Sequence, residues 1–144
     1  MADDLLPDNF PKLLVEGCPD AIIYASAEGV IRYWNRAATR IFGFSAGEAV
    51  GQRLDLIIPE RLRGRHWEGW DRVMAGNPSR YDDGALLAVP AARKDGSPLS
   101  IEFTILPVRD AAGKLTGIAA FLRDGTQRFE EMRALRRELA AFKA

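Results

Sequence analysis

His66 is the sole histidine of the 144-residue chain, and its neighbours make it the first candidate for chemistry. Trp67 and Trp70, two of the three tryptophans, follow it, and arginines stand on both sides of it. An imidazole beside flat apolar rings and guanidinium groups suits a flat, anionic ligand with a metal at its centre. The alternative is a half-exposed histidine on an amphipathic helix, with a tryptophan buried beneath it. Composition alone leaves both interpretations open.

The overall composition limits the class of protein. Twenty basic and twenty acidic side chains cancel and 47% of the residues are hydrophobic, so we expect one globular domain that binds no nucleic acid. No apolar stretch is long enough for a membrane span and the N-terminus lacks a signal-peptide pattern, so we expect a cytoplasmic protein. The single Cys18 excludes an internal disulfide, and His66 with Cys18 cannot fill a zinc site without carboxylates.

Apolar periodicity organises the first half of the chain. It predicts an N-terminal amphipathic helix, a β-hairpin and a short helix, over residues 5–17, 21–34 and 36–42. Asn35 is a suitable N-cap for the short helix, and Gly43 ends it. Ser45 and Glu48 form a capping box for another short helix.

His66 falls in a longer helix, which we expect over residues 59–74. Pro59 suits the first turn of this helix. Three strand-like segments follow, at residues 86–89, 100–105 and 115–122. Arg93-Lys94-Asp95-Gly96 predicts a hairpin turn between the first two. This order of elements is typical of an α+β domain with an antiparallel sheet.

The last segment, residues 126–144, predicts a helix with a heptad pattern. Its apolar positions are Met132, Leu135, Leu139 and Phe142. Such a short heptad segment is not stable alone, so we expect it to pack on a second copy or lead into more protein. The alternative is a monomer in which this helix folds onto its own sheet.

Seven short motifs together resemble a PAS sensor domain. They are Pro19-Asp20-Ala21-Ile22, Gly29-Val30-Ile31, Trp34-Asn35-Arg36-Ala37-Ala38, Phe42-Gly43-Phe44, Glu48-Ala49-Val50-Gly51, Arg93-Lys94-Asp95-Gly96 and Arg123-Asp124-Gly125-Thr126. The resemblance covers roughly residues 10–126. It implies a five-stranded antiparallel sheet, helices inserted between strands two and three, and flanking N- and C-terminal helices. It also implies a cap helix, a PAS sensor domain and a signalling and dimerisation helix, over residues 1–18, 19–125 and 126–144.

Within PAS domains, Ile58-Pro59-Glu60 and Arg63-Gly64-Arg65-His66 are similar to the haem-binding oxygen sensors of the FixL type. That resemblance implies that His66 is the proximal iron ligand of haem b. It implies that Arg72 holds a haem propionate, with Arg80 or Tyr81 as a second partner. The implied pocket walls on the fourth and fifth strands are Phe103, Ile105, Ile118, Ala120 and Leu122.

The helical spacing adds an expectation about the face that carries His66. His66, Gly69 and Trp70 share a face, so Gly69 makes room for a flat ligand, whereas Trp67 turns away. Cys18 is expected in the core at the start of the first strand, with a role as second iron ligand as the minor alternative.

One feature departs from the oxygen-sensor pattern. Those proteins place an arginine on the third strand over the bound gas, whereas this region reads Gly84-Ala85-Leu86-Leu87-Ala88-Val89. Leu86 or Leu87 falls at that site and offers no hydrogen bond to bound oxygen. An apolar distal side favours carbon monoxide or nitric oxide over tightly held oxygen, or a redox role.

Two functions therefore stay open. The first is a haem-based sensor of a diatomic gas or of redox state, a homodimer that signals through its terminal helices to a downstream protein. The second is a haem-free PAS module for dimerisation and interaction, or one that binds another small ligand. The photochemical flavin type does not match, because Arg36-Ala37-Ala38 stands where its cysteine belongs. No nucleophile–base pair or phosphate-binding loop is visible, so we expect no enzyme.

Overall fold

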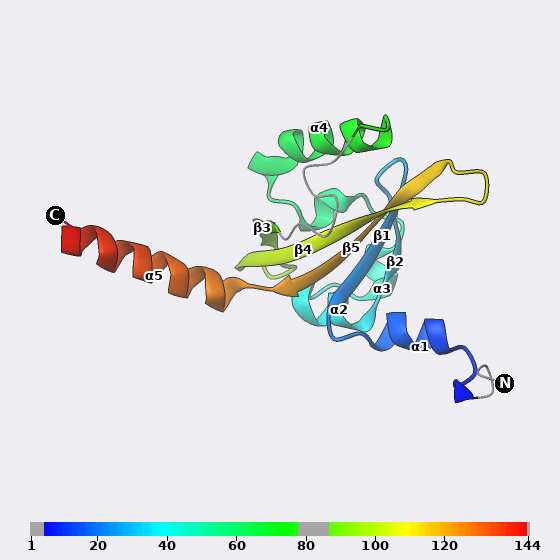
Figure 1. The fold of residues 1–144 in the computed structure, drawn as a ribbon, viewed down its shortest axis with the longest axis horizontal. Coiled ribbons are helices and arrows are strands. Elements are labelled where there is room, and N and C mark those ends of the chain that lie inside the picture. The colour runs from blue at the N-terminus through cyan, green and yellow to red at the C-terminus, as the bar shows by residue number, and fades with distance from the viewer. Residues whose placement is uncertain (1–4, 78–86, 144) are drawn as a thin grey trace.

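A five-stranded antiparallel sheet forms the centre of the computed structural model, which describes residues 5–77 and 87–143 (Figure 1). The strands are β1 (Ala21–Ser26), β2 (Ile31–Trp34), β3 (Leu87–Ala92), β4 (Pro98–Arg109) and β5 (Leu115–Asp124). They lie in the order β2-β1-β5-β4-β3, so the first and last strands of the chain pair at the centre. The predicted α+β fold with this sheet is confirmed.

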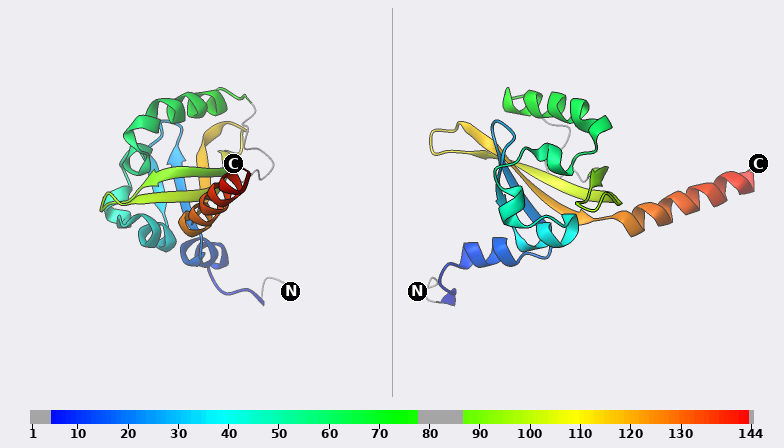
Figure 2. Two further views of the ribbon diagram at one scale, coloured as in Figure 1. Left: turned by 90° about the vertical axis from the view of Figure 1, so that its left-hand side faces the viewer. Right: turned by 180° about the vertical axis from the view of Figure 1, so that it is seen from behind.

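The helices lie between β2 and β3 and at the two ends of the chain. They are α1 (Phe10–Gly17), α2 (Arg36–Phe42), α3 (Ala46–Ala49), α4 (Arg63–Met74) and α5 (Thr126–Lys143), with 3-10 turns η2 (Leu54–Ile57) and η3 (Glu60–Leu62). Both α1 and α5 extend away from the sheet, in opposite directions (Figures 1 and 2). No helix in the described ranges combines the length and apolar character that a bilayer crossing needs.

The helix expected over residues 59–74 begins later than predicted. Residues 60–62 form a 3-10 turn in which the amide of Leu62 donates to the carbonyl of Pro59 at 2.8 Å. The α-helix starts only at Arg63 and ends at Met74, as the sequence predicts. The boundary was missed because an α-helix and a 3-10 turn share the same local residue preferences at a helix start.

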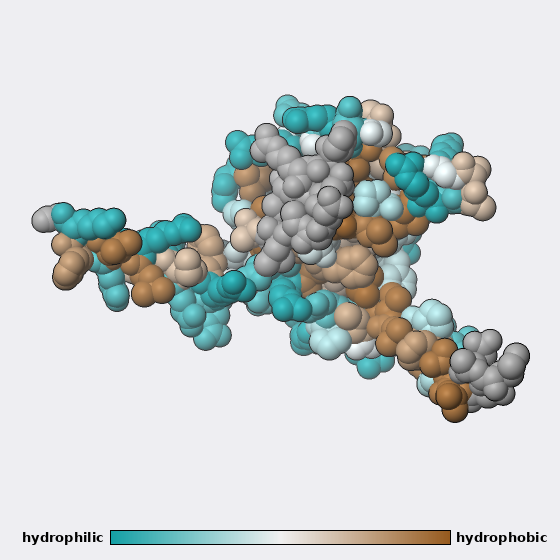
Figure 3. All heavy atoms as spheres, in the orientation of Figure 1, coloured by the Kyte–Doolittle hydropathy of each residue, from teal (hydrophilic) through white to brown (hydrophobic). Residues whose placement is uncertain are grey.

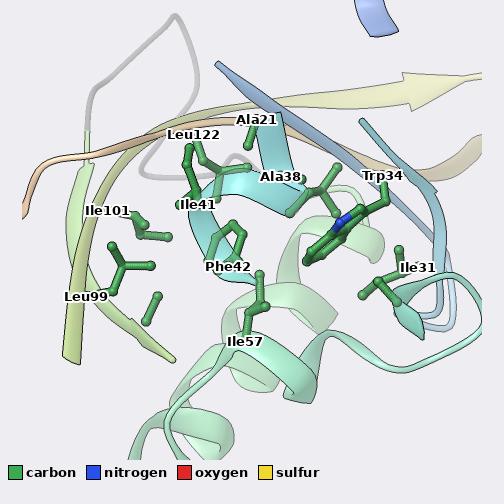
Figure 4. Close-up of a cluster of buried hydrophobic side chains, with 13 residues drawn as sticks. Ala21, Ile31, Trp34, Ala38, Ile41, Phe42, Ile57, Leu99, Ile101 and Leu122 are labelled. Atoms are coloured by element: carbon green, nitrogen blue, oxygen red, sulfur yellow. The ribbon is translucent and has the colours of Figure 1, made fainter. Parts of the chain in front are cut away.

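The main core fills the space between α2 and the helix-facing side of the sheet. Phe42 lies in the middle of this group, with Leu99 and Ile101 on one side and Trp34 and Ile31 on the other (Figure 4). The indole N–H of Trp34 donates to the carbonyl of Phe44 at 3.0 Å, so this large ring is buried without an orphaned donor. The short elements of the first half are therefore held by one shared apolar layer.

Asn35 is the polar exception in this core, with an exposed fraction of 1%. Its side-chain oxygen accepts from the amides of Ile22 at 2.9 Å and Ala38 at 3.1 Å. Its side-chain nitrogen donates to the carbonyls of Val15 at 2.9 Å and Asp20 at 3.1 Å. All four hydrogen-bonding positions of the amide are used. Asn35 thus caps α2, as predicted, and also joins α1 and β1 to it.

Helix α1 is held at its C-terminal end. The hydroxyl of Tyr33 donates to the carboxylate of Glu16, and burial, together with this carboxylate, raises the pKa of Tyr33 to about 12. Cys18 follows α1 as its C-cap and is half-buried, and β1 begins only at Ala21. The expectation that Cys18 starts the first strand is wrong, because α1 runs to Gly17 and residues 18–20 form the connection to β1, which Asn35 holds through the carbonyl of Asp20.

Replacing Asn35 with alanine should lower the free energy of unfolding by about 3 kcal/mol. The substitution removes a cap and leaves buried backbone groups of three segments without partners. Urea denaturation followed by circular dichroism measures the change. Asn77→Ala is the matched control, because Asn77 is exposed, and it should stay within about 0.5 kcal/mol of the parent. Equal effects of the two substitutions would contradict the role given to Asn35.

Candidate functional site

Helix α4 covers one end of the sheet through a second, smaller core cluster. Trp70 is its only buried residue and packs with Ala25 of β1 and Ile118 of β5. The indole N–H of Trp70 donates to the carbonyl of Ala27 at 3.0 Å. Ile105 of β4 packs against the same cluster. The space between α4 and the sheet is therefore filled by an anchored indole.

Trp67 also points inward, so the expectation that it turns away is wrong. Its indole N–H donates to the Asp55 carboxylate at 2.8 Å, and the Arg53 guanidinium carbon lies 4.4 Å from its ring centroid. Its ring also lies against Gly29, where an added Cβ would come within 2.3 Å of Cη2. Residues three apart on a helix are neighbours, so Trp67 and Trp70 can face the same side. The absence of a side chain at Gly29 provides the space for the Trp67 ring.

His66 stands beside both indoles and is half-buried. Its ring centroid lies 4.6 Å from that of Trp67, edge to face, and 6.0 Å from that of Trp70. Burial lowers the pKa of His66 below its ordinary value, and the negative charge of Asp55 opposes this shift. The imidazole is therefore neutral at neutral pH.

One ring nitrogen of His66 makes no hydrogen bond within the described part of the chain. Nδ1 is buried and has no hydrogen-bond partner among these residues. An unpaired buried polar atom carries a desolvation cost, so such atoms call for an explanation. A neutral imidazole with a spare nitrogen is able to ligate a metal or to exchange a hydrogen bond with a bound molecule.

The other predicted positions on and after α4 are only partly brought together. Gly69 is exposed and an added Cβ would meet open space, so it makes no room beneath α4, contrary to the expectation. Arg72 is exposed in the last turn of α4. Leu87 begins β3, opposite Phe103 of β4. The remaining predicted positions lie outside the described residues: Arg80, Tyr81 and Leu86.

The predicted wall residues of β4 and β5 share the helix-facing side of the sheet. Phe103 pairs with Leu122 and Ile105 with Ala120, and Ile118 lies two residues before Ala120 on the same face. Ile105 and Ile118 face the cluster of Trp70, whereas Phe103, Ala120 and Leu122 pack with the main core. Only the first two are therefore close to α4.

The sequence reasoning missed three residues that build the site. Gly29, Arg53 and Asp55 come from the β1–β2 turn and from the segment that leads into η2. The amide of Leu54 donates to the carbonyl of Gly29 at 3.1 Å, which holds these two segments together. The motif around Gly29 was visible in the sequence, but its contact with Trp67 joins positions far apart in the chain.

Gly29→Ala should displace the Trp67 ring and lower the free energy of unfolding by about 2–3 kcal/mol. Two causes add, since residue 29 has a φ of 79° and the new Cβ collides with Trp67. Gly113→Ala is the matched control, with a φ of 84° and open space, and should cost only about 1 kcal/mol. In a Trp67→Phe background the two costs should converge; a difference that persists there would refute the collision.

Comparison with known proteins gives the fold a family. The model of the PAS fold matches residues 15–130. The sensor protein FixL of Bradyrhizobium diazoefficiens is 29% identical over 81% of this chain and 22% of its own length. The oxygen sensor protein DosP of Escherichia coli is 27% identical over 87% of this chain and 15% of its own length. The chain thus spans about a fifth of these relatives or less.

Solved structures give the same fold. An RNA-binding light-oxygen-voltage receptor superposes with a TM-score of 0.75 and 23% identity, over 94% of this chain and 39% of its own. The PAS domain of a protein from Colwellia psychrerythraea gives a TM-score of 0.70 and 19% identity, over 81% of this chain and 95% of its own. Because the family model covers most of the chain, the chain belongs to the PAS domain family.

Proposed function

We propose that this PAS domain is a haem-based sensor in which His66 ligates the iron. The observation that carries the proposal is the neutral, half-buried imidazole whose Nδ1 has no partner among the described residues. A histidine ligand of iron needs a neutral ring in a surrounding that limits water access. Haem supplies redox-active iron that binds diatomic gases.

The donor set fits a cofactor that brings most of its own ligands. In the described ranges, no three side chains of histidine, cysteine, aspartate or glutamate gather into a metal-binding group. A porphyrin supplies four nitrogens, so a single imidazole completes an iron site. Ile105 and Ile118 offer apolar contacts, and the exposed Arg72 is available for a propionate. Trp70 fills the space in this structure, so haem entry requires this ring to move.

The comparisons support a sensor of gas, and they also keep the alternative open. One similar protein is named an oxygen sensor, whereas one similar fold belongs to a light-oxygen-voltage receptor. The second candidate is therefore a haem-free PAS module that dimerises or binds another small ligand at the same face. In the haem-based function, Leu86-Leu87 stands in the sequence where the oxygen sensors place an arginine, so the proposed distal side is apolar. Carbon monoxide, nitric oxide or a redox change is then the proposed signal, rather than tightly held oxygen.

A hydrogen-bonded joint between the sheet and α5 offers a route for the signal. The amide of Gly125 donates to the carbonyl of Ser100 at 2.8 Å, and the amide of Ser100 donates to the Thr126 hydroxyl at 3.0 Å. Arg93 pairs with Asp124 at 3.0 Å just before this joint. A shift of β5 next to α4 therefore moves the start of α5. In this proposal, α5 transmits the change to a downstream partner.

The terminal helices supply the proposed homodimer contact. The heptad residues of α5 are all exposed: Met132 at 46%, Leu135 at 58%, Leu139 at 55% and Phe142 at 90%. Leu13 and Leu14 of α1 are exposed as well. Figure 3 shows hydrophobic surface along part of α5 and on the N-terminal segment. Since α5 extends away from its own sheet, the alternative of a monomer with a folded-back helix does not describe this structure (Figure 2).

Purified protein should be red and show a strong absorption band near the blue edge of the visible spectrum. His66→Ala should lose most of this haem, because no second histidine is available. Cys18→Ala is the matched control and should keep it. Absorption spectra and haem content per protein measure both. Full haem in the His66→Ala protein would refute the ligand, and a colourless parent that also fails to take up added haem would favour the haem-free module.

The loaded protein should hold oxygen weakly and release it quickly, because an apolar distal side gives bound oxygen no hydrogen bond. Carbon monoxide binding should be retained. Gas titration and stopped-flow dissociation measure these constants. Tight and slowly released oxygen would contradict the apolar distal side.

Leu135→Glu and Leu139→Glu should each weaken self-association by at least about tenfold. A leucine buried in a contact contributes about 1.5–3 kcal/mol, and a factor of ten corresponds to about 1.4 kcal/mol. Analytical ultracentrifugation measures the dimer dissociation constant. Ala141→Glu is the control on an outward position of the same helix, and an equal loss with this control would argue against the heptad contact.

A further inference from the structure

Asp55 of η2 is linked to α4 by several contacts. Oδ1 accepts from Trp67 Nε1 at 2.8 Å and lies 4.0 Å from Arg63 Nε, and Oδ2 lies 3.7 Å from Arg53 Nε. The backbone carbonyl of Asp55 also accepts from Arg63 Nη2 at 3.2 Å. One residue of η2 is thus joined to α4 both before and after His66.

The Trp67 ring is confined by these contacts to a single position. The Arg53 guanidinium lies on the ring at 4.4 Å, and Gly29 leaves no space beyond it on its own side. The hydrogen bond to Asp55 then fixes the rotation of the indole, because N–H donors need a well-aligned acceptor. A confined side chain of this size also fixes the stretch of backbone that carries it.

His66 lies between the two tied residues. Arg63, in the first turn, donates from Nε to the carbonyl of Ile58 at 3.1 Å, and Trp67 follows His66 directly. The centroid distance of 4.6 Å shows that the indole of Trp67 is in contact with the imidazole and limits its movement. Rotation of this turn of α4 would move His66 and break the Trp67–Asp55 hydrogen bond together.

We propose that Asp55 is the positioning residue of His66, acting through the indole N–H of Trp67. The value of a fixed imidazole rests on the proposed function, in which His66 is an iron ligand. Groups behind a metal ligand orient it and commonly change metal affinity about 10–100-fold when removed. Trp70, whose ring centroid lies 6.0 Å from that of His66, is the competing anchor, through its bond to Ala27.

The single histidine allows a direct test on haem-free protein. Diethyl pyrocarbonate modifies neutral imidazole, so the rate at His66, measured at about pH 8 where the ring is neutral, reports its accessibility. Asp55→Leu should raise this rate roughly tenfold, the factor that corresponds to about 1.4 kcal/mol. Asp55→Asn keeps a side-chain oxygen acceptor and should stay near the parent. Asp71→Leu, an exposed acid on the same helix, is the control and should also stay near the parent.

Trp67→Phe removes the donor and keeps an aromatic ring, so it should raise the rate as Asp55→Leu does. The double variant should then react no faster than the faster single variant, because both substitutions break the same bond. Hydrogen exchange of β1 and β5 amides in the same samples separates local release of α4 from global unfolding. If Asp55→Leu unfolds globally, Asp55→Asn and Trp67→Phe decide.

Unchanged reactivity in folded Asp55→Leu or Trp67→Phe protein would overturn the proposal. Equal reactivity of the Asp55→Asn and Asp55→Leu proteins would do the same, since the acceptor would then have no effect. Trp70→Phe increasing the rate alone would assign the role to the other anchor. Because these measurements use haem-free protein, they stand whether or not the chain takes up haem, and the haem test can fail independently.

Discussion

A buried amide, that of Asn35, is the constraint on which the rest of the structure depends. Its four hydrogen bonds join the end of α1, the start of β1 and the first turn of α2. A buried polar group is stable only when all its partners are present, so these three segments have one permitted arrangement. The inner strand β1 is fixed in this way. It then presents Ala25 to the cluster of Trp70 and leads into Ala27, whose carbonyl accepts the indole N–H of Trp70. The geometry of the candidate site therefore depends on Asn35, which is bonded to the opposite end of β1.

Helix α4 is held in a different manner from α2. Four residues of α2 are buried, whereas only Trp70 is buried in α4. The two indole hydrogen bonds, of Trp67 and Trp70, supply the specific attachment in place of a wide apolar face. A helix with little buried surface opens locally at a smaller cost than the core does. In the proposed function a ligand enters between α4 and the sheet, and a low cost of local opening suits that role, while the first turns of α4 stay bonded to η2.

The two terminal helices are each attached to the domain at one end and exposed beyond that attachment. Helix α1 is fixed at its C-terminal end by Asn35 and Tyr33, and α5 is fixed at its start by the joint around Gly125. Beyond these attachments both helices present apolar side chains to solvent. Because the joint at Gly125 is bonded to β4 and follows β5, a change in the sheet would reach α5 directly in the proposed function. The exposed heptad face is where such a change would be read by a second copy or a partner.

Local residue patterns predicted the caps at Asn35, Gly43 and the Ser45–Glu48 pair, the five strands and the heptad face of α5, all of which the structure contains. These features depend on neighbours a few residues apart, so the sequence by itself determined them. The inward position of Trp67, the open surroundings of Gly69 and the place of Cys18 outside β1 were predicted wrongly. Each is decided by a contact between distant segments, such as Trp67 with Gly29 and Asp55. Only the tertiary structure brings those groups together. The helical period predicts which residues share a face, but it does not predict which face packs against the sheet.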